Sequence, residues 1–242
     1  PLKSVLMVTH NIEEAVLMCD RILVFTSNPG RIATELRIPF AHPRNRLDPA
    51  FRQMVDEIYA VMTRRAAPPA APTVLTAHDA TFATPLHPVS TNLLAGLLEA
   101  LAAPPYSGRA DLPALAASLQ MEADELLPLG ETLQLLGFAA LAEGDIRLLE
   151  PGRKSVHADT DERKLLFADA LRAHVPLVAA IRRTIDERWN HRASAVRFRD
   201  ELEDHMSPDY AEDTLRTAIT WGRYAELFSY DEEAQQFSLD NI

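Results

Sequence analysis

At the start of the chain, a short run of apolar residues is followed directly by a segment whose apolar residues have the spacing of a helix. Residues 5–9 are all apolar or β-branched, which predicts a short strand buried on both faces. Asn11 then offers a helix N-cap with two glutamates behind it, so a helix is expected over residues 12–19. His10 therefore lies between a strand end and a helix start, where open α/β sheets bind ligands.

A hairpin and one more helix are predicted next. Residues 20–25 and 31–38 alternate as strands around the turn signal Asn28-Pro29-Gly30. Pro49 then occupies the first position of a helix. Six apolar residues on one face of this helix recur at helical spacing: Phe51, Met54, Val55, Ile58, Tyr59 and Met62.

Proline and alanine dominate the stretch that follows residue 66. This composition predicts an extended linker over residues 67–88. His78 and His87 lie within it, and neither has a partner at metal-ligand spacing. Both are therefore expected to be solvated histidines.

Residues 89–155 have the pattern of a first winged-helix-like unit. Thr91 or Asn92 caps a helix that runs to about residue 102, Asp111 caps a second helix, and a third is expected over residues 124–136. Glu143-Gly144-Asp145 is a tight hairpin turn between two short apolar runs. Three helices followed by a hairpin is the order of a winged helix.

The pattern then repeats. A connecting helix with an interruption at Pro176 is expected over residues 156–193. Residues 194–242 predict two further helices and a hairpin, and so form a second winged-helix-like unit. The predicted fold is mixed: an α/β tail over residues 1–66, in the order strand, helix, β-hairpin and helix, followed by a mainly α tandem winged-helix-like domain.

Composition narrows the class of protein. The chain has 242 residues, of which 47% are hydrophobic and 24% charged, as in globular proteins. No apolar run approaches the roughly 20 residues that span a bilayer. Cys19 is the single cysteine, so an intrachain disulfide is excluded and a reducing compartment is favoured. We expect Cys19 to be a small buried hydrophobic residue without metal or catalytic chemistry.

The charge distribution bears on the winged-helix-like units. Net charge is −11 overall, with +2 in residues 1–66, −5 in residues 67–193 and −8 in residues 194–242. The third helix of the first unit has no basic residue to read base edges. It carries Asp124, Glu125, Glu131 and Gln134. Protein contact is therefore favoured over DNA.

The N-terminal stretch VLMVTHNIEEAVLMCDRILVFTSNPGRI resembles the region after the Walker B strand in ATP-binding subunits of ABC transporters. It is most similar to the nitrate/sulfonate/taurine-type importer branch. Thr-His, the acidic helix opening, Asp-Arg-Ile and Pro-Gly-Arg-Ile occur in the expected order. The resemblance implies that His10 is the switch histidine, which contacts the γ-phosphate of ATP and the attacking water.

Other parts of an ATPase do not occur in these residues. There is no G-x-x-x-x-G-K-[ST] loop, no Walker B strand and no signature motif. The chain is therefore expected to be a fragment that neither binds ATP tightly nor hydrolyses it alone, whereas the parent protein would be an ATPase using ATP and Mg. No protein ligand for a metal is assigned.

The stretch DLPALAASLQMEADELLPLGETLQLLGF resembles the AAA-associated C-terminal domain of transporters in the same branch. The resemblance implies an accessory or regulatory role. The parent would be the ATP-hydrolysing subunit of an importer for a small anion such as nitrate, sulfonate or taurine. Its partners would be a permease and a second ATPase subunit, at the cytoplasmic face of the membrane. A winged-helix transcription regulator and a pure partner-binding module are the alternatives.

Overall fold

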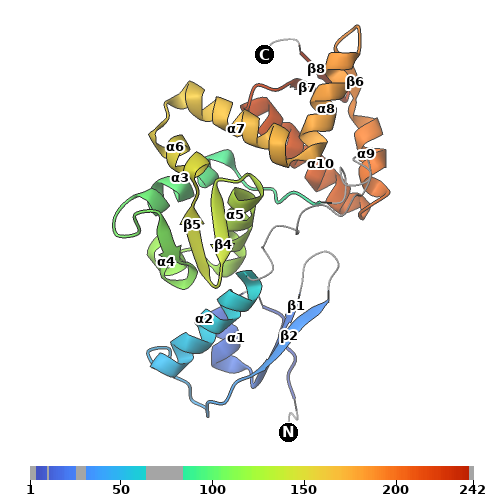
Figure 1. The fold of residues 1–242 in the computed structure, drawn as a ribbon. Helices are drawn as coiled ribbons and strands as arrows, with labels where there is room; N and C mark the ends of the chain where they lie inside the picture. The colour runs from blue at the N-terminus through green and yellow to red at the C-terminus, as the bar shows by residue number, and fades with distance from the viewer. Residues whose placement is uncertain (1–3, 10, 26–30, 64–83, 240–242) are drawn as a thin grey trace, which may run out of the picture.

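The protein is described here by a computed structural model that covers residues 4–9, 11–25, 31–63 and 84–239. Its elements follow one another in space much as they do in sequence (Figure 1). A small α/β segment at the N-terminus lies at one end. Two sets of helices with three-stranded sheets, here called the first repeat and the second repeat, make up the remainder.

The N-terminal segment has the predicted helix, hairpin and second helix. Its two strands pair antiparallel, and its two helices contact each other, with Val16, Phe51 and Ile58 buried in the same hydrophobic cluster. Asn11 caps the first helix as expected, because its Oδ1 accepts from the backbone N–H of Glu14 at 2.8 Å. The elements are α1 (Ile12–Met18), β1 (Arg21–Phe25), β2 (Ile32–Arg37) and α2 (Pro49–Thr63).

The strand predicted at residues 5–9 is wrong. Residues 4–9 have no strand assignment, and Val5, Leu6 and Val8 are 79%, 90% and 93% exposed. A strand buried on both faces needs neighbouring strands that supply hydrogen bonds and cover its side chains. Among the described residues, β1 and β2 pair only with each other, so no such neighbour exists.

The first repeat is a three-stranded antiparallel sheet with helices beside it. The strand order is β3-β5-β4. Asp111 caps α4 as predicted, whereas Ser90, and not Thr91 or Asn92, caps α3 by accepting from the backbone N–H of Asn92 at 3.2 Å. Its elements are α3 (Thr91–Ala102), β3 (Arg109–Asp111), α4 (Leu112–Leu119), α5 (Ala123–Leu135), β4 (Ala139–Ala142) and β5 (Asp145–Leu148).

The second repeat has the same succession of elements and the equivalent strand order, β6-β8-β7. Phe237 of β8 is fully buried, and the rings of Phe198, Phe228 and Tyr230 surround it at centroid distances of 5.0–5.8 Å. Its elements are α8 (Pro176–Glu187), β6 (Arg192–Ser194), α9 (Ala195–Glu203), α10 (Pro208–Tyr224), β7 (Ser229–Asp231) and β8 (Gln236–Ser238).

Two further helices, α6 (Glu150–His157) and α7 (Thr160–His174), join the repeats. The expected break lies at Val175, where α7 ends and α8 begins with Pro176. From α7, Phe167 reaches Phe138 in the first repeat and Trp221 and Tyr224 in the second. The connecting helix therefore shares one aromatic core with both repeats.

Residues 84–90 link α5 to α10. Leu86 is buried, and its N–H donates to the hydroxyl of Thr214 at 3.3 Å. His87 lies 2.8 Å from the carboxylate of Glu131, and its side chain remains 41% exposed, so it is solvated as predicted on one side and has an acidic partner on the other. Partial burial against α5 provides this partner, which the linker composition does not reveal. His78 lies outside the described residues.

The architecture is thus a mixed fold in which helices predominate and the sheets are small and antiparallel. Among the helices that the structure describes, none combines the length and hydropathy of a membrane span.

Candidate functional site

His10, the histidine singled out from the sequence, lies outside the described residues, but both of its neighbours are described. Thr9 accepts from the backbone N–H of Asn11 at 3.1 Å through Oγ1, and the same hydroxyl donates to the Glu14 carboxylate at 3.0 Å. Together with the Asn11 cap, these bonds form a hydrogen-bonded ring of Thr9, Asn11 and Glu14. The ring holds the chain on either side of position 10.

The ring also contacts the first repeat. Nδ2 of Asn11 donates to the carboxylate of Glu122 at 2.6 Å, across 111 residues of sequence. Glu122 is the N-cap of α5, and its own N–H donates to Oε2 of Glu125 at 3.2 Å. A hydrogen bond to a carboxylate is shorter and stronger than one between neutral groups. The start of α1 is therefore tied to the start of α5.

A second contact joins α2 to the turn between β4 and β5 (Figure 1). The N–H of Gly144 donates to the hydroxyl of Thr63 at 2.8 Å in a buried setting, and that hydroxyl donates to the carbonyl of Tyr59 at 2.9 Å. Gly144 has φ of +88° and lies against Ala60. Glycine adopts this φ without strain and has no side chain, so the backbone of the tight turn can lie directly against α2.

Tyr59 of α2 is buried, and carboxylates of the first repeat and of the N-terminal segment affect its pKa. Burial, together with the negative charges of Glu122, Glu13 and Asp111, raises the pKa of Tyr59 to about 12. Burial and Asp111 also raise the pKa of Asp56 above its usual value. Glu122 and Asp111 belong to the first repeat, so the phenol of α2 is perturbed by carboxylates from both sides of the junction.

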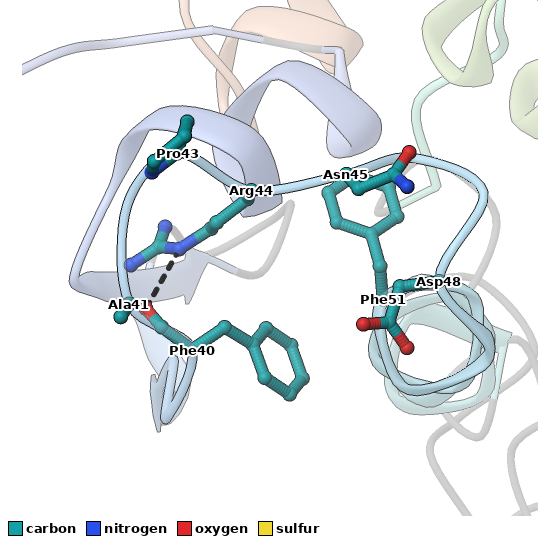
Figure 2. Close-up of a pocket in the computed structure, with 7 residues that line it drawn as sticks. All are labelled: Phe40, Ala41, Pro43, Arg44, Asn45, Asp48 and Phe51. Atoms are coloured by element: carbon teal, nitrogen blue, oxygen red, sulfur yellow. Dashed lines mark hydrogen bonds between the residues drawn. The ribbon is translucent and has the colours of Figure 1, made fainter.

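A hollow of about 320 Å³ in the N-terminal segment lies beside Arg44 (Figure 2). The Arg44 side chain is 1% exposed. Its guanidinium donates to the carbonyls of Phe40, Val16 and Cys19 at 3.0, 2.9 and 2.6 Å, and to the carboxylate of Asp20 at 3.1 Å. Because these donors are used within the protein, Arg44 satisfies the backbone carbonyls at the end of α1 and does not hold a ligand.

The structure thus brings together residues that the sequence did not connect. Asn11 was expected as a cap. Its hydrogen bond to Glu122, and the hydrogen bond of the Gly144 N–H to Thr63, could not be predicted from the neighbouring sequence. Cys19 is half-buried, not fully buried as expected. Among the described residues, no group of three or more His, Cys, Asp or Glu side chains is placed to hold a metal ion.

Comparisons with known proteins agree with both resemblances. Residues 113–231 match the family described as the C-terminal AAA-associated domain. The N-terminal part is similar to aliphatic sulfonates import ATP-binding proteins. The identity is 42% over 24% of this chain for the protein of Frankia casuarinae, 34% over 28% for that of Burkholderia cenocepacia, and 41% over 28% for that of Burkholderia pseudomallei. No solved structure matches.

The chain spans only 18%, 26% and 21% of the length of these three relatives. The similarity therefore covers a minor part of an ATP-binding protein, and the AAA-associated match covers most of both repeats. This chain thus has an N-terminal part similar to ATP-binding subunits of ABC importers, followed by residues 113–231, which match the C-terminal AAA-associated domain family.

Proposed function

We propose that this chain is part of the ATP-hydrolysing subunit of an importer for a small anion such as a sulfonate, nitrate or taurine. The observation that carries the proposal is the similarity of the N-terminal part to aliphatic sulfonates import ATP-binding proteins. In this subunit His10 is the switch histidine that contacts the γ-phosphate. ATP and Mg would be held by the rest of the subunit, because these residues contain no phosphate-binding loop.

We further propose the division into an ATPase tail (1–66), a linker (67–88), a first winged-helix-like unit (89–155), a connecting helix (156–193) and a second such unit (194–242). The equivalent strand orders β3-β5-β4 and β6-β8-β7 support the two winged-helix-like units, and the shared succession of elements places α8 and β6, which begin at Pro176 and Arg192, with the second of them. The start of α5 and the β4–β5 turn would read DNA in such a unit. Here both contact the N-terminal segment, which supports a protein-binding accessory domain over a transcription regulator.

The proposed partners are a permease and a second ATPase subunit. An importer subunit of this kind works at the cytoplasmic face of the membrane and reaches the bilayer only through its permease. The acidic second repeat is poorly suited to anionic surfaces, because like charges repel.

The test of this function is ATP hydrolysis by the complete subunit that contains this chain. We expect His10→Ala to lower kcat by about 10²–10³-fold, the loss typical for one hydrogen-bond donor that stabilises charge in the transition state. His205→Ala, which removes an exposed histidine of the second repeat, is the matched control and should leave kcat unchanged. A complete subunit without ATPase activity, or a His10→Ala variant as active as the control, would contradict the proposal.

A further inference from the structure

We propose that the second repeat carries a dimerisation surface, in which Trp189 of each copy of this chain lies against the β7–β8 turn of a second copy. Two parts of the repeat form this surface: the loop between α8 and β6, residues 188–191, and the turn between β7 and β8, residues 232–235. The contact goes beyond the proposed ATPase function, because it requires neither ATP nor the rest of the subunit.

Trp189 belongs to a loop whose backbone is held in place. The residue is 93% exposed. The N–H of His191 donates to the carbonyl of Arg188 at 3.0 Å, and the guanidinium of Arg188 donates to the carbonyl of Arg192 at 3.2 Å. A tryptophan on a fixed loop offers a large contact area and loses little conformational entropy on binding. Tryptophan and arginine are also enriched among the residues that dominate binding energy at interfaces.

The first repeat shows how an aromatic residue at this position can be covered within the chain. Tyr106 lies three residues before β3, as Trp189 lies three residues before β6. The Tyr106 hydroxyl donates to Oγ of Ser118, the seventh residue of α4, at 2.7 Å, and the ring packs against the core. The seventh residue of α9 is Glu201, which accepts from Nε of Arg197 at 2.9 Å. An ion pair thus replaces the hydroxyl that binds Tyr106, and Trp189 remains exposed.

The loop and the turn lie at opposite ends of one small sheet. The loop leads into β6 at Arg192, and the turn leads into β8 at Gln236. Because the two strands pair antiparallel with Arg192 opposite Ser238, the two ends are about 7–10 Å apart. Two copies of this sheet in antiparallel orientation therefore bring each loop to the other copy's turn, which gives a closed two-fold contact. The sheet lies far from the N-terminal segment, which leaves room for a second copy (Figure 1).

The two ends of the sheet differ in charge. Residues 182–199 carry six arginines and two carboxylates, whereas residues 200–239 carry two arginines and eleven carboxylates. Arg188 of the loop is exposed, as are Glu232 and Glu233 of the turn, and within the described part of the chain none of the three forms an ion pair. An antiparallel pair of copies brings these opposite charges together twice. An anionic bilayer is disfavoured as the partner, because the eleven carboxylates repel it.

The turn end also offers an apolar side chain. Val196, in the first turn of α9, is 42% exposed. It lies beside the β7–β8 turn, because the N–H of its neighbour Ala195 donates to the carbonyl of Gln235 at 2.8 Å. The indole of Trp189 combines an apolar ring with an N–H donor, so it suits a surface of one apolar side chain bordered by carboxylates. The loop and the turn are therefore complementary in both charge and polarity.

The first arm of the test measures self-association of the full chain by sedimentation equilibrium. One loop and one turn make a small, transient type of contact, so we expect a Kd of about 10–100 µM. Trp189→Ala should raise this Kd by about tenfold to thirtyfold, as for a central aromatic residue of an interface. Tyr210→Ala removes another aromatic residue of the second repeat, 63% exposed, and should leave the Kd unchanged. A chain that stays monomeric at concentrations of about 200 µM, or an equal Kd in the two variants, overturns the proposal.

The second arm tests whether the loop of one copy meets the turn of another. One variant changes the exposed residues Arg183 and Arg188 to glutamate, and the other changes Glu232 and Glu233 to arginine. Each variant alone should be monomeric, because like charges then face each other. An equimolar mixture should form a heterodimer with a Kd within about threefold of wild type, because both contacts regain opposite charges. A mixture that stays monomeric, or variants that dimerise alone as wild type does, overturns this arrangement.

A third measurement separates a second copy from a membrane. Wild type and Trp189→Ala are sedimented with phosphatidylglycerol vesicles, and we expect neither to bind. Binding of a monomeric wild type that is lost in Trp189→Ala would assign the loop to a bilayer and overturn the dimer. Circular dichroism spectra of all variants should match wild type, because every substituted residue is exposed. No readout involves ATP, so the dimer and the proposed ATPase function can fail independently.

Discussion

Arg44→Ala is expected to destabilise the N-terminal segment by about 2–5 kcal/mol, because it leaves backbone carbonyls at the end of α1 without their donor. The guanidinium of Arg44 satisfies Val16 and Cys19 together and ties them to the loop after β2. Within the described part of the chain, that loop provides no other donor to these two carbonyls. The segment should therefore lose the attachment between α1 and residues 38–48.

The control for this variant is Arg46→Ala. Arg46 is an exposed arginine of the same loop, 3.4 Å from the Glu13 carboxylate, and both side chains are 55% exposed. Surface ion pairs of this kind contribute about 0–1 kcal/mol, so its loss should be small. Hydrogen exchange of peptides from α1 and β2 in increasing urea measures both variants. Equal protection in the two variants would mean that Arg44 does not close the helix end.

Trp221→Ala should cost about 3–5 kcal/mol of unfolding free energy, the range for removing a large aromatic side chain from a core. Trp221 is fully buried on α10, and its indole N–H donates to the carbonyl of Val89 at 3.0 Å. Its ring meets Phe167 of α7 edge-on at a centroid distance of 6.2 Å. The substitution would therefore loosen the second repeat from both α7 and residues 84–90.

The chain contains a matched control for this prediction as well. Its other tryptophan, Trp189, is 93% exposed, so Trp189→Ala should change stability by less than about 0.5 kcal/mol. Trp221→Phe should fall between the two, because it keeps a ring but loses the donor to Val89. Urea unfolding followed by circular dichroism gives the three values. A loss below about 1 kcal/mol for Trp221→Ala would show that the two repeats do not share this core.

Local signals predicted most of the helices and hairpins. Asn11, Asp111 and Pro49 each mark a helix start by their own chemistry, and Gly144 marks a turn, so these features need no knowledge of distant residues. By contrast, β3 and β6 were missed. Each has three residues, too few to show a period of two, and each is a strand only because it pairs with a hairpin that comes later in the sequence.

The errors share a physical cause, which is dependence on a partner far away in sequence. The apolar run at residues 5–9 is a strand only where other strands flank it, and the described residues supply none. Arg44 has no local feature that distinguishes it from the exposed Arg46. The resemblance proposes His10 as the candidate site residue, whereas no feature of the sequence predicts the hydrogen bond between its neighbour Asn11 and Glu122.

The proposed accessory role requires that the first repeat be held against the N-terminal segment, so the contact of the β4–β5 turn with α2 is the central claim. Nuclear Overhauser spectroscopy and amide exchange at Gly144 in the whole chain test it most directly. We predict cross-peaks from Gly144 to the side chains of Thr63 and Ala60, together with slow exchange of the Gly144 amide. A Gly144 amide that exchanges at the rate of an open turn, with no cross-peak to α2, would contradict the claim.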